Sequence, residues 1–185
     1  MSSLITPTSG LTQLAIATTN SGSPIIALPF DFQGYRALLV KGLFNTLFDA
    51  GSNEDNVYLE AAPTPTSIQG ANITTKGAVS ASNISTSNIP LGNVYATPDL
   101  GNFSRMSVLT MYLYIQDALT NHIYFDWTLS SGNAADSAFS ASQGRGCIVY
   151  STEPTAIQIK NNRGRNWCSA GELVMFGISK LPISL

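Results

Sequence analysis

The chain has 185 residues, of which 44% are hydrophobic and 11% carry a charge, less than half of the roughly 25% found in an average soluble domain. This length and composition predict one folded domain and exclude a disordered chain. A net charge of −2 gives no electrostatic attraction to nucleic acid or to an anionic membrane, and no segment approaches the ~18 apolar residues of a spanning helix, so we expect neither partner.

Residues 1–22 lack the basic start and the long apolar run of a secretory signal, so we expect synthesis and assembly in the cytoplasm. We interpret this segment as an N-terminal arm or docking segment, ahead of one domain over residues 23–185; a frayed terminus is the alternative. Its candidate contact residues are Leu4, Ile5, Leu11 and Leu14. Helix signals are confined to residues 10–18 and 42–50, both short and poorly capped.

Short runs rich in β-branched and aromatic residues recur along the chain and predict strands. In residues 105–116 and 122–130 apolar side chains alternate with mixed ones, and the five-residue link "DALTN" predicts that these two strands pair as a hairpin. The pattern as a whole predicts an all-β fold, an antiparallel, jelly-roll-like β-sandwich. The other expected strands are 23–30, 35–44, 56–61, 147–152, 155–161 and 172–179.

Two segments are rich in small polar residues. Residues 62–104 consist largely of Ser, Thr, Asn, Ala and Pro. They form either an extended excursion lying on a neighbouring subunit or a pair of edge strands with long loops, which we favour. Residues 130–146 are expected to be a loop, with "QGRG" (143–146) as a turn, because it lacks the spacing and the lysine of a phosphate-binding loop.

The sequence offers little for catalysis. It has no G-x-S-x-G nucleophile motif, and its only histidine, His122, follows a turn and is expected at a hairpin end. Five carboxylates could in principle form a glycosidase pair, but no signal selects two of them. We therefore expect no enzyme activity, no catalytic residue, no cofactor and no metal. The five are Asp117, Asp126, Asp136, Glu153 and Glu172.

Two cysteines, Cys147 and Cys168, are too few for a disulfide scaffold. Both lie near the starts of predicted strands, so they could pair if those strands are neighbours. A reducing site of synthesis favours two free, mostly buried thiols.

One basic turn, "KNNRGRNW" (160–167), carries Lys160, Arg163 and Arg165. Arginines on a rigid turn make bidentate contacts with carboxylates. We expect these side chains to contact a partner subunit, through the equivalents of Glu54, Asp55 or Glu60 on another copy; a solvated hairpin turn is the alternative.

The segment "TAIQIKNNRGRNWCSAGELVMFGISK" (155–180) resembles a C-terminal pattern of tailed-bacteriophage virion proteins. An isoleucine-rich strand is followed by a polar glycine turn, a small-residue corner and a last strand ending in "YGI" or a close variant. Phe176 stands where tyrosine is commoner, and Glu172 where serine or threonine often sits. Gly177, after the bulky Phe176, predicts a bulge or a close approach to another backbone. The matching residues are Ile157, Ile159, 161–166, 169–171, Leu173 and 175–178.

This resemblance covers about the last 30 residues and implies a β-sandwich that assembles as trimers on a capsid or within fibres. It implies that the protein belongs to the virion, without saying where on the virion it sits. Together with the low charge and the lack of catalytic groups, the resemblance leads us to expect a decoration (cement) protein that binds the outer head surface and stabilises it. The implied partners are two further copies of the chain in a homotrimer and the major capsid protein, or tail and fibre proteins. Phe176 becomes a further candidate contact.

A receptor- or glycan-binding module of a tail or fibre is the alternative function. Aromatic faces stack on sugar rings, and four aromatic residues lie in the two strongest predicted strands. We expect most of these rings in the core or at sheet edges, which counts against this function. The four are Tyr112, Tyr114, Tyr124 and Trp127.

Overall fold

The computed structural model describes residues 11–19, 22–29, 35–46, 54–76, 79–86, 88–95, 106–115, 121–133, 138–167 and 171–179. These form twelve β-strands in two antiparallel sheets. The described residues contain no helix, so none of them forms a helix that could cross a membrane. The larger sheet has the order β1 (Leu11–Thr18), β12 (Glu172–Ser179), β3 (Tyr35–Phe44), β8 (Ser107–Ile115), β9 (His122–Asn133), β10 (Ala138–Val149), β5 (Ser67–Lys76), β6 (Val79–Ser85).

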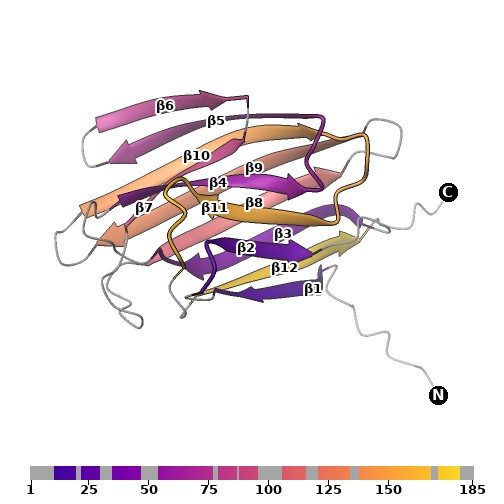
Figure 1. Cartoon of the computed structure of the whole chain (residues 1–185), viewed down its shortest axis with the longest axis horizontal. Coiled ribbons are helices and arrows are strands. Elements are labelled where there is room, and N and C mark those ends of the chain that lie inside the picture. The colour runs from indigo at the N-terminus through magenta and orange to yellow at the C-terminus, as the bar shows by residue number, and fades with distance from the viewer. Residues whose placement is uncertain are drawn as a thin grey trace, which may run out of the picture.

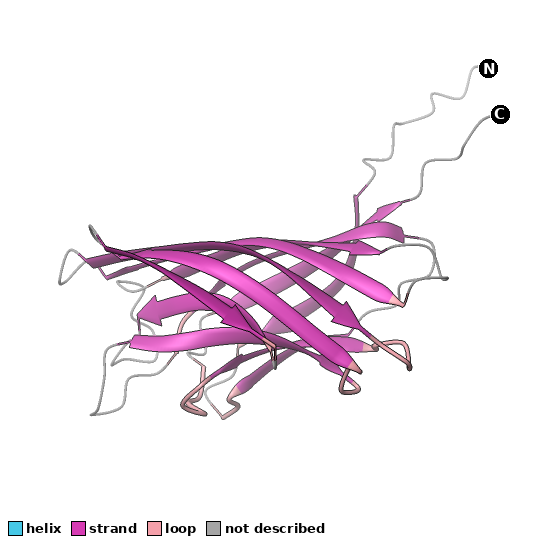
Figure 2. Ribbon diagram, turned by 90° about the horizontal axis from the view of Figure 1, so that it is seen from above, coloured by secondary structure: helices cyan, strands magenta, loops and turns pink. Residues whose placement is uncertain are grey.

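The smaller sheet has four strands and lies in front of the larger one in Figure 1. Seen from above, the strands form two layers (Figure 2). The all-β sandwich is therefore confirmed, with sheets of unequal size, eight strands against four. The order of the smaller sheet is β2 (Ile25–Pro29), β11 (Ala156–Asn161), β4 (Glu54–Ala62), β7 (Ile89–Tyr95).

The core lies between the sheets and follows the period-two pattern of the strands. In β8 the side chains of Leu109, Met111 and Leu113 are wholly buried, while Tyr112 and Tyr114 on the opposite face are exposed. β9 repeats this arrangement and pairs with β8 in the register Tyr112↔Asp126, which confirms the predicted hairpin pairing. The same alternation thus fills the core with one face of the large sheet and leaves the other face outside.

The weak helix candidate at residues 10–18 is not a helix over its described part, residues 11–18, and this part of the expected arm belongs to a sheet. These residues form β1, which pairs with β12 at the edge of the large sheet. Beyond the strand, the amide of Thr19 donates to the carbonyl oxygen of Gly171 (2.8 Å), and the amide of Gly171 donates to Thr19 Oγ1 (2.7 Å). Pairing with a distant strand therefore overrides the weak local helix propensity.

The second helix candidate, residues 42–50, is also not a helix over its described part, residues 42–46. Residues 42–44 belong to β3, and Thr46 forms an isolated bridge with Trp167; residues 47–50 lie outside the described part. The expected loop over 130–146 is wrong as well, since β9 runs to Asn133 and β10 begins at Ala138. "QGRG" is therefore the middle of a strand rather than a turn.

The segment 62–104 contributes three strands, β5, β6 and β7, to the sandwich. β6 ends the large sheet and β7 ends the small one, so the interpretation as edge strands describes it better than an excursion does. Gly177 of β12 is closely approached by a side chain rather than by the backbone that was expected. A Cβ there would lie 2.3 Å from the ring of Tyr35, so the absence of a side chain makes room for that ring.

Candidate functional site

The outward side of the large sheet, called here the outer face, is unusually apolar. Eleven large hydrophobic side chains are exposed among the described residues, and all but Ile25 project from this face. Ile84 is the extreme case, with 84% of its surface exposed. The ten are Leu11, Ile16, Leu43, Ile73, Ile84, Val108, Tyr112, Tyr114, Tyr124 and Phe139.

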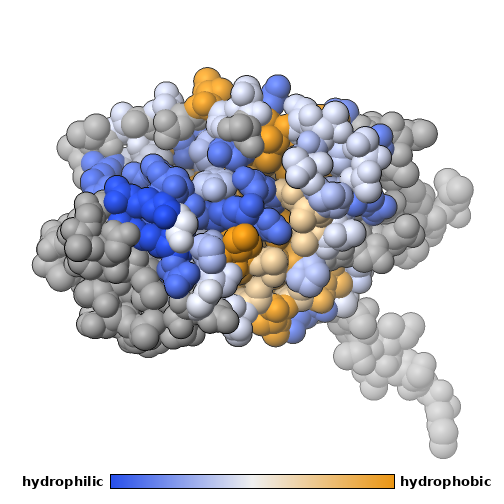
Figure 3. All heavy atoms as spheres, viewed as in Figure 1, coloured by the Kyte–Doolittle hydropathy of each residue, from blue (hydrophilic) through white to orange (hydrophobic). Residues whose placement is uncertain are grey.

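The outward side of the small sheet differs from the outer face. It carries Glu60 and Lys160 next to Gln158, and the surface seen in Figure 3 is mostly hydrophilic with scattered hydrophobic groups. Soluble monomers rarely leave a large contiguous apolar patch exposed. The contrast between the two sides makes the outer face the candidate contact surface of the described residues.

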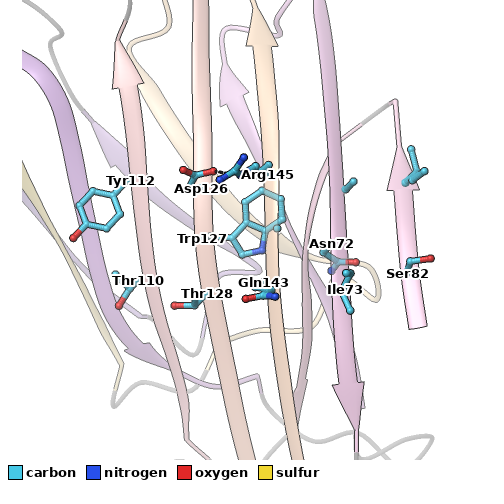
Figure 4. A pocket seen from close by; sticks show the side chains of 13 residues that line it. Asn72, Ile73, Ser82, Thr110, Tyr112, Asp126, Trp127, Thr128, Gln143 and Arg145 are labelled. Atoms are coloured by element: carbon cyan, nitrogen blue, oxygen red, sulfur yellow. Dashed lines mark ion pairs between the residues drawn. The ribbon is translucent and has the colours of Figure 1, made fainter. Parts of the chain in front are cut away.

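A shallow groove of about 670 Å³ crosses the outer face over β8, β9, β10, β5 and β6. Figure 4 shows two rows of side chains in it. One row, set by strand register, runs through Tyr112, Asp126 and Arg145 to Ala71 and Ile84. The second row runs through Thr110, Thr128, Gln143, Ile73 and Ser82.

The groove has one ion pair near its middle, in which Arg145 Nε lies 3.0 Å from Asp126 Oδ1. Tyr114 lies in the neighbouring row, and its ring stacks beside that of Tyr112 with centroids 6.3 Å apart. Partial burial raises the pKa of Tyr114, and the charge of Asp126 raises it further, so this phenol stays protonated and can donate a hydrogen bond. The site thus offers aromatic rings, one cation, one anion, an amide and hydroxyl groups.

The expectation that most of the four aromatic candidates lie in the core or at sheet edges is wrong. Tyr112, Tyr114 and Tyr124 are each about two-fifths exposed on inner strands of the large sheet. Only Trp127 belongs to the core, where its indole N–H donates to the carbonyl oxygen of Leu91 (3.0 Å). The tyrosines lie on the same side of their strands as Val108 and Thr128. The alternation in the sequence already grouped these residues on one face.

Two of the three charged side chains of the basic turn pair with carboxylates of the same chain. Lys160 Nζ lies 2.6 Å from Glu60 Oε2, and Arg165 Nε lies 3.7 Å from Asp55 Oδ2. The acidic partners named from the sequence are therefore right for two residues, but they belong to the same chain. Arg165 is buried, which excludes it as a partner contact, whereas Arg163 is exposed at the tip of the turn.

The remaining candidate contacts are divided. Leu4 and Ile5 lie outside the described residues. Leu11 is 44% exposed on the outer face, whereas Leu14 is half-buried and packs against the core. Phe176 is half-buried and projects from the outer face in the same row as Tyr112. Leu11 and Phe176 therefore belong to the apolar outer face.

The described titratable groups do not assemble into a recognisable catalytic or metal site. No three His, Cys, Asp or Glu side chains come together within the described ranges. Asp126 and Glu172 lie three strand spacings apart, about 14 Å across the sheet, which exceeds the separation of a glycosidase pair. Glu153 is exposed, while Asp117 and Asp136 lie outside the described residues.

Cys147 is a free thiol, half-buried on the outer face, and burial raises its pKa. Its predicted counterpart Cys168 lies outside the described residues. His122 is half-buried at the start of β9, where its ring stacks beside that of Tyr124, with centroids 6.1 Å apart. Neither residue is placed among groups that would make it a nucleophile or a base.

Ile73, Ile84, Gln143 and Arg145 are among the groove residues that sequence reasoning missed. They come from segments interpreted as a long polar stretch and a turn. That these side chains all point to the outer face could have been found only if β5, β6 and the first half of β10 had been recognised as strands.

Comparison of the chain with protein-family models, with curated proteins and with solved structures found no match.

Proposed function

We propose that this chain is an assembly subunit whose outer face is covered by other protein. The observation that carries the proposal is the placement of ten of eleven exposed large hydrophobic side chains on one face of one sheet. Tyrosine and other aromatic residues are enriched at protein interfaces. The low charge content of 11% supports the same function.

In finer terms, we propose a structural protein of a bacteriophage virion, acting as a decoration protein that binds the outer head surface. The resemblance of residues 155–180 to virion proteins supports this placement, as does a chain whose apolar surface is gathered on one side. A protein that binds the assembled shell but not its dissociated subunits stabilises the shell by linkage. The partners would be the major capsid protein and further copies of this chain.

The test measures the thermal transition of heads assembled without this chain, before and after adding the purified protein. We expect the wild-type chain to raise the transition temperature and to co-sediment with the heads. Val108→Lys, which puts a charge into the outer face, should bind at least about tenfold more weakly, a loss of ~1.4 kcal/mol.

Ile25→Lys is the matched control, because Ile25 is the one described exposed large hydrophobic residue on the small sheet. It should bind the heads like the wild type. An unchanged transition and no co-sedimentation of the wild-type chain would refute placement on the head, and equal loss in both variants would refute the outer face as the docking surface.

A saccharide-binding module is the second candidate, because Tyr112, Tyr114 and Tyr124 are exposed beside the groove. Sugar rings would stack on these tyrosines, and the Asp126–Arg145 pair with Gln143 would bind hydroxyl groups. We expect a glycan array probed with the wild-type chain to give defined hits that Tyr112→Ala and Arg145→Ala abolish. Tyr58→Ala, on the small sheet, should leave them unchanged. An array without hits, combined with binding to heads, rejects this candidate.

A further inference from the structure

The sandwich has four edge strands, β1 and β6 in the large sheet and β2 and β7 in the small one. An edge strand presents unpaired backbone N–H and C=O groups, and proteins commonly guard it with proline, charge or a bulge. Three of these edges carry such a device. β2 ends at Pro29, β7 contains Pro90 and a register shift against β4, and β1 has a register shift between Gln13 and Ala15.

β6 has none of these devices. Its sequence, "VSASNIS", contains no proline, no glycine and no charged residue, and it pairs with β5 in unbroken register from Val79 to Ser85. Its outward-projecting side chains are exposed, and Ile84 is exposed to 84%, since none of the twelve described strands lies on the far side of β6. The end of the large sheet at β6 is therefore open to addition of a further strand (Figure 1).

We propose that β6 pairs antiparallel with β6 of a second copy of this chain. A two-fold axis through the middle of the strand gives full overlap, with Ser82 opposite Ser82 of the partner subunit. Ile84 then lies opposite Ser80 of the partner subunit, and no charged side chains oppose one another, because β6 carries none. The pairing satisfies backbone groups of both edges and covers part of Ile84.

This dimer deepens the proposed function by naming one partner, a second copy of the chain. Its biological use rests on the proposed function, whereas the pairing itself is argued from the β6 edge alone. An antiparallel two-fold edge pairing keeps both outer faces on the same side of the joined sheet. Two weak docking surfaces then act together on one particle, which raises the overall affinity without any new contact. A seven-residue edge buries little surface, so the dimer forms in a concentration-dependent way.

The test measures the mass of the full chain by sedimentation equilibrium over a range of concentrations. The wild-type chain should shift from monomer to dimer as its concentration rises. Ser82→Lys and Ser82→Glu should each stay monomeric, because two like charges then face each other across the axis. An equimolar mixture of the two variants should recover the dimer, because unlike charges then oppose each other.

Thr75→Lys is the matched control, an exposed outward position on β5, one strand away from the edge. It should dimerise like the wild type, and far-UV circular dichroism should show that every variant keeps its strand content. A wild-type chain that is monomeric or trimeric throughout, single variants that dimerise like the wild type, or a mixture that stays monomeric would each overturn the proposal.

The two proposals fail separately. Val108→Lys should dimerise normally while losing its affinity for heads. If the Ser82 variants keep the wild-type mass and the wild type binds heads, the edge pairing is wrong and the proposed function stands. If the dimer forms as described but no head is bound, the edge pairing stands and the proposed function is wrong.

Discussion

Asp55→Ala will lower the free energy of unfolding by about 3–5 kcal/mol, because it leaves the guanidinium of Arg165 buried without its carboxylate. The two side chains are almost fully enclosed, with 0% of Asp55 and 3% of Arg165 exposed. The backbone of Arg165 cannot turn outward easily. Its amide donates to Asn161 Oδ1 (2.8 Å), and its carbonyl oxygen accepts from Asn161 Nδ2 (2.7 Å). Urea denaturation followed by circular dichroism measures the loss.

Glu54→Ala is the control, one residue earlier on β4. Glu54 pairs with Lys76, and the two side chains are 31% and 48% exposed. A solvent-exposed pair of this kind contributes about 0.2–1 kcal/mol. The double variant Asp55→Ala/Arg165→Met should lose less than Asp55→Ala alone, because no unpaired charge stays buried. Equal losses for Asp55→Ala and Glu54→Ala would show that the buried pair is not what stabilises this end of the sandwich.

Gly92→Ala in β7 will destabilise the fold by on the order of 3 kcal/mol, from backbone strain and overpacking together. Gly92 has a φ of 139°, a conformation that residues with a side chain rarely adopt. A Cβ there would also lie 2.1 Å from Ser142 Oγ and 2.5 Å from Ser142 Cβ on the facing sheet. The substitution therefore pushes the two sheets apart where β7 covers β10.

Gly132→Ala in β9 is the matched control, because a Cβ there meets no atom within 4 Å. It should change the unfolding free energy by less than about 0.5 kcal/mol. Adding Ser142→Gly to Gly92→Ala should restore part of the stability, since it removes the clash but not the backbone strain. Similar midpoints of thermal unfolding for the two alanine variants would contradict the close approach of β7 and β10.

The sequence predicted the strands in which bulky apolar residues alternate. β8 and β9 are the clearest, because Leu109 to Leu113 and Ile123 to Leu129 leave one face with no polar side chain. β5, β6 and the start of β10 were harder to recognise, since Ser, Thr, Asn and Gly give little contrast between their two faces. β1 was not predicted as a strand because its strand conformation depends on pairing with β12, which lies at the other end of the chain.

The candidate site could be predicted only in part, for a related reason. The tyrosines of β8 share one parity, but their exposure follows from the second sheet, which covers one side of the large sheet and leaves the other bare. Likewise, the basic turn was matched with the right acidic residues, Asp55 and Glu60. The sequence contains no information on whether such a pair forms within one chain or between two, because that depends on the packing of β11 beside β4.

Pairing of Lys160 and Arg165 within the chain has a consequence for the kinetics of assembly. The chain has a net charge of only −2, so its long-range field is weak, and on the outer face Asp126 and Arg145 form a neutral pair. Without electrostatic steering, association proceeds at the basal rate of about 10⁵–10⁶ M⁻¹s⁻¹, with little dependence on ionic strength. Lifetime in the bound state, rather than speed of encounter, therefore determines how firmly this protein is held.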